Sequence, residues 1–521
     1  MTCKRARYKA FLVLAWFVAQ LVIGTIPRSV AAMVTPKAAE PLDMTGAIQI
    51  KDPFASCHAN SYDIMADLGV KTNREDISWT EIEPSPGTWY WTNWDNRIAG
   101  LKAKNMTAEP ILDYGNLNVQ NGTTHGNRIY TEHDIQEWLK YTNKCVERYY
   151  KNDSNYTKYW ELWNEPNLGD FNASSGFWTG TDQEYFALQK RTAANLSAQF
   201  PGVQLVSAGI SGHDPSYLDA MFAAGAMDNV NVLAFHPYSG LNYETLDTKI
   251  AEVKSVCAKY NFNGPIWITE VGMSTQFDPN ATNFEDAYQQ SLELQATLVP
   301  KVYCQALANN ISYIVWYCLG DYNRGGNWTY YDWTWGEANF GLVFASNNPY
   351  KPGPYQNDIL KPAGYAYEAI AHQLNWSKYI PHGVVNSILP SASKLRTYYF
   401  LKANGDIVFI CWNSNGAPEQ IQFTLPATGV QVFAAPSYKP GAATNYQVTN
   451  ESSGVTVTAT IDFTPTIFVM HMPSGASPVS IVINSQVTFY DISLLVVIPA
   501  LVAACVIVFV VKFKGRREAK L

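Results

Sequence analysis

The sequence alternates between strand-like and helical patterns from about residue 45 to residue 375, and this alternation constrains the fold more than any other feature. Short β-branched and apolar runs are predicted to form strands at Gly46–Ile50, Val70–Asp76, Thr107–Tyr114, Lys158–Glu165, Val203–Gly209, Val230–Tyr238, Pro265–Val271 and Ile311–Leu319. A helical stretch follows each run. Eight such pairs indicate an α/β fold, a (β/α)8 TIM barrel over 45–375. A doubly wound open sheet shares the alternation, but no Gly-x-Gly-x-x-Gly follows the first strand to support a dinucleotide-binding version.

The pattern changes after Leu374, where the helical periods end. Short strands separated by turn residues are predicted at Arg396–Leu401, Ile407–Trp412, Gln420–Leu425, Val430–Ala434, Gly454–Ile461 and Thr466–Met472. Regularly spaced short strands are typical of a small all-β sandwich, which we expect over 380–473. Residues 474–491 read as a polar spacer.

Both ends of the chain carry long apolar runs. Basic residues precede an apolar stretch at Ala10–Ile26, and small residues follow it, so residues 1–32 are predicted to be a secretory signal peptide; an uncleaved anchor is the alternative. The stretch 492–511 has no charge and is followed by four basic residues, which predicts a C-terminal transmembrane helix with a cytosolic tail at 512–521. A buried core helix is the alternative for this stretch. The expected location is the cell membrane, single-pass, with the barrel and the sandwich extracellular.

The composition of the region between the ends excludes several classes of protein. With 14% aromatic residues, the chain can bury a large core and is not disordered. Residues 33–490 carry 27 basic and 42 acidic groups, a net charge of −15, which makes nucleic acid an unsuitable partner. Eleven Asn-x-Ser/Thr tripeptides agree with a glycoprotein: Asn105, Asn121, Asn152, Asn155, Asn172, Asn195, Asn280, Asn310, Asn327, Asn375 and Asn450.

Six cysteines lie between the two ends, without the Cys-x-x-Cys spacing of a zinc site: Cys57, Cys145, Cys257, Cys304, Cys318 and Cys411. Disulfides and free buried thiols both remain open for them. The sequence implies no metal and no cofactor, since metalloprotease, P-loop and Gly-x-Ser-x-Gly motifs do not occur. The oligomeric state stays unknown.

Two glutamates close predicted strands. Glu165 follows Trp163-Asn164 at the end of the fourth strand, and Glu270 follows Ile268-Thr269 at the end of the seventh. The carboxyl ends of barrel strands face one mouth, so the two carboxyls are expected in one cleft. Glycoside hydrolysis needs such a pair, one protonated and one ionised.

The Trp-Asn-Glu-Pro at 163–166 and the Ile-Thr-Glu at 268–270 resemble clan A of the glycoside hydrolases, the retaining (β/α)8 enzymes. Arg74, with the Trp, Glu-Pro, Gly and Asp residues that follow it, resembles the corresponding run of families 39 and 42, and the barrel also resembles family 5. The resemblance implies that Glu165 is the acid/base and Glu270 the nucleophile. It also implies that Arg74, Asn164, His236, Tyr238 and Trp316 bind the substrate.

Several neighbouring residues have more than one interpretation. Glu161 lies four residues before Glu165 on the same strand and is expected to be a buried partner of Arg74 rather than a catalyst. Trp163 and Trp316 are expected to be part core and part sugar platform, and Tyr114 and Asn116 are weaker candidates for the cleft wall. The aromatic segment 321–337 is expected to be a loop at the mouth, with a plain surface loop as the alternative.

The sequence therefore predicts an O-glycosyl hydrolase that cleaves β-linked oligo- or polysaccharides by double displacement. The alternative is a non-catalytic carbohydrate-binding or cell-envelope protein on an inactive barrel.

Overall fold

The computed structural model describes residues 40–486, except for 60, 122–126, 170–176, 241, 324, 326–330, 389–393, 440–442, 444 and 453. Eight parallel strands form a closed barrel in the order β10-β3-β4-β5-β6-β7-β8-β9. Their bounds are β3 (Phe54–Cys57), β4 (Thr72–Asp76), β5 (Thr107–Leu112), β6 (Tyr159–Asn164), β7 (Gln204–Ser211), β8 (Leu233–His236), β9 (Ile266–Val271) and β10 (Ile314–Trp316). The predicted (β/α)8 barrel is confirmed, and the open-sheet alternative is wrong.

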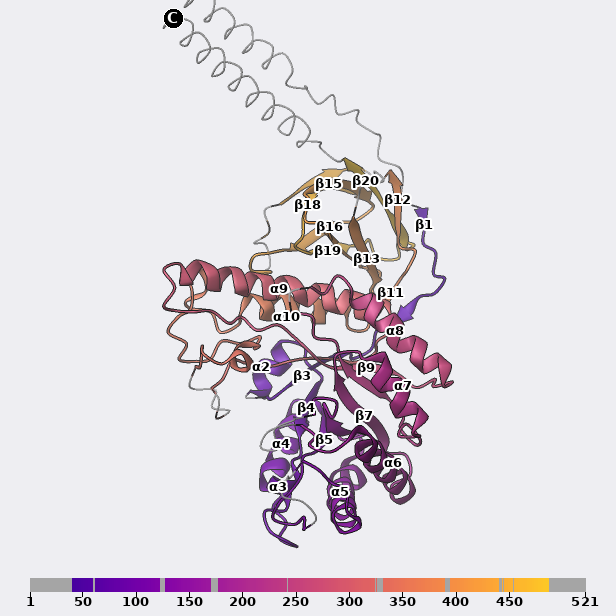
Figure 1. Cartoon of the computed structure of the whole chain (residues 1–521). Coiled ribbons are helices and arrows are strands. Elements are labelled where there is room, and N and C mark those ends of the chain that lie inside the picture. The colour runs from indigo at the N-terminus through magenta and orange to yellow at the C-terminus, as the bar shows by residue number, and fades with distance from the viewer. Residues whose placement is uncertain are drawn as a thin grey trace, which may run out of the picture. The chain divides into compact units, whose positions relative to one another are not determined.

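Helices follow the strands and cover the outside of the barrel (Figure 1). They are α2 (Tyr62–Asp67), α3 (Trp79–Ile82), α4 (Thr92–Ala103), α5 (Glu132–Asp153), α6 (Asp182–Gln199), α7 (Pro215–Ala223), α8 (Leu246–Lys259), α9 (Phe284–Ala308) and α10 (Pro362–Leu374). Local sequence sets several helix starts. Thr181 and Glu184 form a reciprocal capping box at the start of α6, and Asp214 caps α7 just before Pro215.

The first barrel strand lies later in the chain than the sequence pattern predicted. Ile48–Gln49 form β2, which pairs with β11 (Lys378–Tyr379) in a sheet of the second domain, whereas β3 at Phe54–Cys57 closes the barrel. Both segments are short and partly apolar. The alternation of apolar and polar residues that predicts a strand does not indicate which sheet the strand joins. The strand predicted at Gly46–Ile50 is therefore wrong as a barrel strand.

The second domain is a sandwich of two mainly antiparallel sheets. One sheet has the order β1-β20-β15-β18-β17, with β12 pairing parallel to β20, and the other has the order β16-β19-β14-β13-β11-β2. All six strands predicted here occur, as β13 (Leu395–Leu401), β14 (Ile407–Asn413), β15 (Glu419–Leu425), β16 (Gly429–Phe433), β18 (Gly454–Ile461) and β19 (Thr466–His471). The sequence reading missed β1 (Glu40–Pro41), β12 (Val384–Ile388) and β17 (Tyr446–Glu451).

The predicted spacer at 474–491 is not all spacer, because β20 (Val479–Gln486) lies inside it. This strand pairs with β1, β12 and β15 and buries Ile481 and Ile483 between the two sheets. The alternation of apolar residues at 479, 481 and 483 is the pattern of a half-buried strand. The sandwich therefore reaches at least to Gln486.

The predicted signal peptide at 1–32, the predicted transmembrane helix at 492–511 and the tail at 512–521 lie outside the described residues. Within the described part of the chain, no helix combines the length and the apolar character that a membrane span requires. The six described cysteines are buried and free.

Candidate active site

A cavity of about 680 Å³ opens at the carboxyl ends of the barrel strands. Its volume falls within the range of ~300–1,000 Å³ that is usual for small-molecule sites. The lining combines acids, cations, aromatic rings and small residues: His58, Arg74, Asp76, Tyr114, Asn164, Glu165, Leu168, Phe177, Ser211, Tyr238, Gly240, Glu270, Gly272, Met273, Ser274, Tyr317, Glu337 and Phe340. The barrel mouth thus holds both glutamates that the sequence singled out.

Glu165 and Glu270 face each other across this cavity although 105 positions separate them in the sequence. One carboxyl oxygen of each, together with a ring nitrogen of His236, lie within 4.8 Å of one another. Glu165 is 7% exposed and Glu270 8% exposed. The two carboxyls therefore form a close, largely desolvated pair.

The backbone at the end of β6 turns to bring Glu165 to the rim. Trp163 and Glu165 both have positive φ angles, 87° and 44°, which are uncommon for residues other than glycine. The Glu165 amide donates a hydrogen bond to the carbonyl of Gly209 on β7, which holds the turned segment to the barrel. Unusual backbone of this kind occurs often at functional sites.

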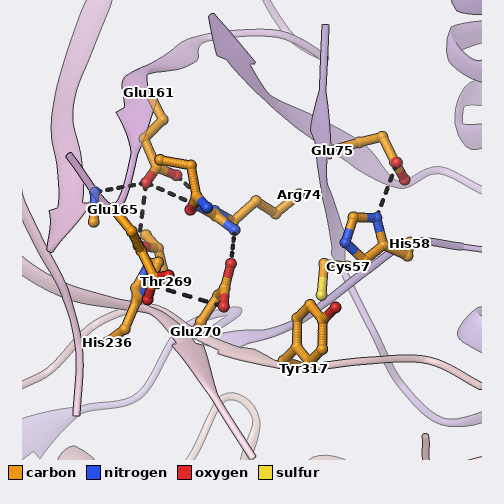
Figure 2. A network of polar contacts seen from close by, with 12 residues as sticks. Cys57, His58, Arg74, Glu75, Glu161, Glu165, His236, Thr269, Glu270 and Tyr317 are labelled. Carbon is orange, nitrogen blue, oxygen red and sulfur yellow. Dashed lines mark hydrogen bonds and ion pairs between the residues drawn. The ribbon is translucent and has the colours of Figure 1, made fainter. Parts of the chain in front are cut away.

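Arg74 on β4 links the floor of the site to its rim (Figure 2). Its Nε and Nη2 donate to the two oxygens of Glu161, at 2.6 and 3.0 Å, and its Nη1 donates to Glu270 Oε1 at 2.7 Å. Nη2 also donates to Asn164 Oδ1 at 2.8 Å. The expected Arg74–Glu161 pair is confirmed, and the guanidinium also fixes the orientation of Glu270.

The opposite sides of the two carboxyls contact His236, the last residue of β8, and Tyr238, which follows that strand. His236 Nδ1 lies 2.9 Å from Glu165 Oε1 and 3.7 Å from Glu270 Oε2. The Tyr238 hydroxyl donates to Glu270 Oε2 at 3.0 Å. Glu270 is thus held from two sides by Arg74 and Tyr238, and Glu165 is held by His236.

The two glutamates have different electrostatic environments. Burial raises the pKa of Glu165 from 4.5 to about 7, against an opposing effect of Arg74. Burial also lowers the pKa of His236 to about 4, although the Glu270 carboxylate opposes the shift. Glu270 instead accepts a charge-assisted hydrogen bond from the Arg74 guanidinium at 2.7 Å. One carboxyl is therefore suited to donate a proton near neutral pH and the other to remain an anion.

Glu165, His236 and Glu270 are also the group of described side chains whose geometry fits a metal ion. A cation placed there would lie close to the Arg74 guanidinium, which already neutralises Glu270 at 2.7 Å. The donor set therefore fits an acid–base pair better than a metal centre.

Only some of the predicted substrate-binding residues line the cavity. Arg74, Asn164 and Tyr238 line the cavity, whereas His236 and Trp316 are fully buried and do not. The Trp316 indole donates to the carbonyl of Phe340, so it is part of the interior, and the structure does not support the expected sugar-stacking Trp at this position. His236 reaches Glu165 rather than the space that a substrate would occupy.

Of the residues that the sequence suggested less strongly, some line the cavity and others are buried behind it. Tyr114 lines the cavity and its hydroxyl accepts a hydrogen bond from Asn164 Nδ2. Asn116 is buried and donates to the carbonyl of Glu83, which supports a loop behind the site. Trp163 is 1% exposed and packs among aromatic rings, so it belongs to the core. The segment predicted at the mouth contributes Glu337, while Asp321 pairs with Lys361 in the interior.

Sequence reasoning missed several lining residues. His58 directly follows β3, so placing the first strand at 46–50 hid it. Tyr317 follows β10 and Asp76 ends β4, and both could have been found by the strand-end rule. His58 Nδ1 lies 3.1 Å from Glu75 Oε1. Burial lowers the pKa of His58, but the charge of Glu75 outweighs this effect and raises the pKa to about 9.

Comparison with known proteins finds similarity in structure alone. Neither a protein-family model nor a curated protein sequence matches this chain. A family 39 glycoside hydrolase from Bacteroides cellulosilyticus superimposes with a TM-score of 0.56 at 16% identity, covering 81% of each chain. The family 39 enzyme from Xanthomonas axonopodis pv. citri gives 0.55 at 16% identity and covers 86% of this chain and 100% of its own. A monomeric beta-xylosidase from Caulobacter crescentus gives 0.55 at 13% identity, with coverage of 84% and 98%. Likeness at these identities shows a shared fold.

Proposed function

We propose that this protein is a retaining glycoside hydrolase that cleaves β-linked O-glycosidic bonds of oligo- or polysaccharides. The observation that carries the proposal is the approach of the Glu165 and Glu270 carboxyls to within 4.8 Å at the mouth of a barrel. Carboxyls of retaining enzymes lie ~5–5.5 Å apart, whereas inverting enzymes need ~6.5–9.5 Å to admit a water molecule between them. The fold shared with solved glycoside hydrolases agrees with this assignment.

In the first step, Glu270 attacks the anomeric carbon of the sugar. An oxygen of Glu270 forms the new bond to carbon, and the bond from that carbon to the leaving oxygen breaks. The leaving oxygen takes the proton of Glu165. The partners of Glu270 suit this role, because Arg74 and Tyr238 orient its two oxygens from different sides.

In the second step, Glu165 acts as a base. A water molecule gives a proton to Glu165, and its oxygen bonds to the anomeric carbon as the ester bond to Glu270 breaks. The sugar leaves with its original anomeric configuration, and both carboxyls return to their starting states. The pKa of about 7 for Glu165 suits both directions of proton transfer near neutral pH.

Hydrogen bonding by the remaining wall residues would orient the sugar. Asn164 is held by Arg74 and Tyr114 beside the pair, where the resemblance to clan A implies contact with the 2-hydroxyl. Tyr317 and Phe340 also line the cavity and supply aromatic surface.

The test is hydrolysis of a panel of aryl β-glycosides and β-linked oligosaccharides by the full chain. Glu270→Gln should lower kcat by about a thousandfold or more while leaving the fold intact. Glu147→Gln removes an exposed carboxyl from α5 and is the matched control. Early products should keep the β configuration in proton NMR spectra. Near-full activity of Glu270→Gln would refute the assignment, and sugar binding without any hydrolysis would favour the non-catalytic alternative.

We also propose, from the sequence alone, that the barrel and sandwich face the outside of the cell from a membrane anchor at 492–511. The uncharged stretch, the basic residues after it and the eleven glycosylation tripeptides support this location. Membrane fractionation and enzymatic deglycosylation test it. A chain that stays in the aqueous fraction and keeps its mobility after deglycosylation would contradict it.

A further inference from the structure

A chain of buried polar side chains runs beneath Glu165 to the floor of the site (Figure 2). It starts at the carboxyl of Glu161, passes through the hydroxyl of Thr269 and the imidazole of His236, and ends at Glu165. The successive distances are 3.3, 3.0 and 2.9 Å. Glu161, Thr269 and His236 are fully buried, so water does not compete for these contacts.

Glu161 sets the donor-to-acceptor direction of these hydrogen bonds, because its carboxyl oxygens accept a hydrogen bond at every contact. Its oxygens accept from the Arg74 guanidinium and from the Gly209 amide, which approaches Oε1 at 2.9 Å. A guanidinium and a backbone amide can only donate, so both Glu161 oxygens act as acceptors in these contacts. The Thr269 hydroxyl is therefore the donor in its contact with Glu161.

A hydroxyl has one proton, so Thr269 must accept where it meets His236. The ring proton of His236 then lies on Nε2, which faces Thr269 Oγ1. The pKa of His236 is lowered to about 4 by burial, so the ring is neutral near pH 7 and carries a single proton. Its other nitrogen, Nδ1, is left with a lone pair that points at Glu165 Oε1.

We propose that Thr269 and Glu161 lock His236 in the tautomer protonated on Nε2, so that Nδ1 accepts a hydrogen bond from the protonated carboxyl of Glu165. The inference rests on the proposed function, because it explains why Glu165, of the two carboxyls, keeps the proton. Thr269 and His236 are positioning residues, since neither lines the cavity.

The same tautomer serves both steps of the proposed reaction. Before the first step, the Nδ1 lone pair stabilises the carboxyl that holds a proton. After Glu165 has given its proton to the leaving oxygen, the lone pair faces a carboxylate, and their repulsion strengthens Glu165 as the base that activates water.

Other charged and titratable groups also act on Glu165 and His236. Arg74 on β4 favours the ionised form of Glu165 and the neutral form of His236, whereas Glu270 on β9 and Glu161 on β6 favour a protonated His236. Burial and the charge of Glu165 raise the pKa of Glu337. Tyr238 stays neutral, because burial raises its pKa well above the usual value. None of these groups contacts His236 Nε2, so the tautomer depends on Thr269.

Gly209 on β7 provides the space for this chain. A Cβ atom at this position would lie 2.0 Å from His236 Nε2 and 2.5 Å from Thr269 Oγ1, which no side chain could accommodate without displacing them. The glycine also supplies the amide that binds Glu161. Its small size therefore makes the chain of hydrogen bonds possible.

The first test compares Thr269→Val, which keeps the volume and loses the hydroxyl, with Thr269→Ser, which keeps the hydroxyl. Without its acceptor at Nε2, the imidazole is free to move its proton to Nδ1 and donate to the Glu165 carboxylate. The alkaline limb of kcat/KM for a poor leaving group should then shift to lower pH by about one unit in Thr269→Val. In Thr269→Ser the limb should keep its wild-type position. An unchanged limb in a folded Thr269→Val would overturn the proposal.

The second test reads the tautomer directly and needs no substrate. In the full chain with ¹⁵N-labelled histidine, the His236 signals, assigned by their loss in His236→Ala, should show the proton on Nε2 and a bare Nδ1. A proton on Nδ1, or on both nitrogens, near pH 7 would overturn the inference. If no glycoside is hydrolysed while the Nε2 tautomer is observed, the proposed function fails and the hydrogen-bond chain stands. If the wild type hydrolyses glycosides, Glu270→Gln is inactive and the His236 proton lies on Nδ1, the proposed function stands and the inference about the tautomer fails.

Discussion

Replacing Glu165 with glutamine should stabilise the protein in alkaline solution. The native state binds the Glu165 proton more tightly than the unfolded state does, because burial raises its pKa from 4.5 to about 7. The stabilisation that this proton supplies is complete below pH 4.5 and is lost as the pH rises through about 7. Glutamine is neutral at every pH and retains an amide proton for His236 Nδ1, so the variant avoids this loss.

The magnitude follows from the two pKa values. Between about pH 4.5 and pH 8.5, the free energy of unfolding of the wild type should fall by about 3 kcal/mol relative to that of Glu165→Gln. All other titrating groups are common to both proteins, so their contributions cancel in the difference. Glu165 is only 7% exposed, and solvent screening therefore reduces the effect little.

Guanidinium denaturation at the two pH values measures this difference, with Glu147→Gln as the control for loss of an exposed carboxyl. The midpoint of Glu165→Gln should exceed that of the wild type at high pH and approach it at low pH. The control should follow the wild type at both. An equal difference at both pH values would refute the argument that Glu165 is the carboxyl that holds a proton near neutrality.

Three further outcomes follow from the same geometry. Glu161→Gln breaks the buried pair with Arg74 and should lower the free energy of unfolding by about 3–5 kcal/mol, whereas a loss below about 1 kcal/mol would contradict the pairing. Tyr238→Phe removes a hydrogen-bond donor to Glu270 and should lower kcat/KM by about tenfold to a hundredfold, with unchanged stereochemistry. An unaltered kcat/KM would show that this hydrogen bond does not contribute to catalysis. Aryl β-glucuronides should react at least about tenfold more slowly than aryl β-glucosides, because the two cations of the cavity, His58 and Arg74, are paired with Glu75 and Glu161 while four carboxyls line the cavity; equal rates would count against this charge balance.

The sequence located the candidate carboxyls because parallel barrel strands end on one rim. Once Glu165 and Glu270 were placed at strand ends, their approach across the cavity followed from topology. The pairing of Glu161 with Arg74 could be predicted for a related reason, because residues four apart on a strand lie on the same side.

The remaining features depend on contacts that no local pattern encodes. Ile48–Gln49 read like a first barrel strand, but its partner, β11, lies more than 300 residues away in the sequence. Trp316 was expected to bind the substrate, yet its side chain is fully buried and the next residue, Tyr317, lines the cavity. The Thr269–His236 contact joins neighbouring strands through side chains and shows no signal in either segment.

Trapping the glycosyl-enzyme tests the central claim most directly. A 2-deoxy-2-fluoro glycoside with an activated leaving group slows both steps and allows the ester intermediate to accumulate. Peptide mapping by mass spectrometry should then find one fluorosugar on the peptide that contains Glu270, and none in Glu270→Gln. A label on Glu165, on another residue, or on no residue of a protein that turns over the parent glycoside would contradict the proposed division of roles.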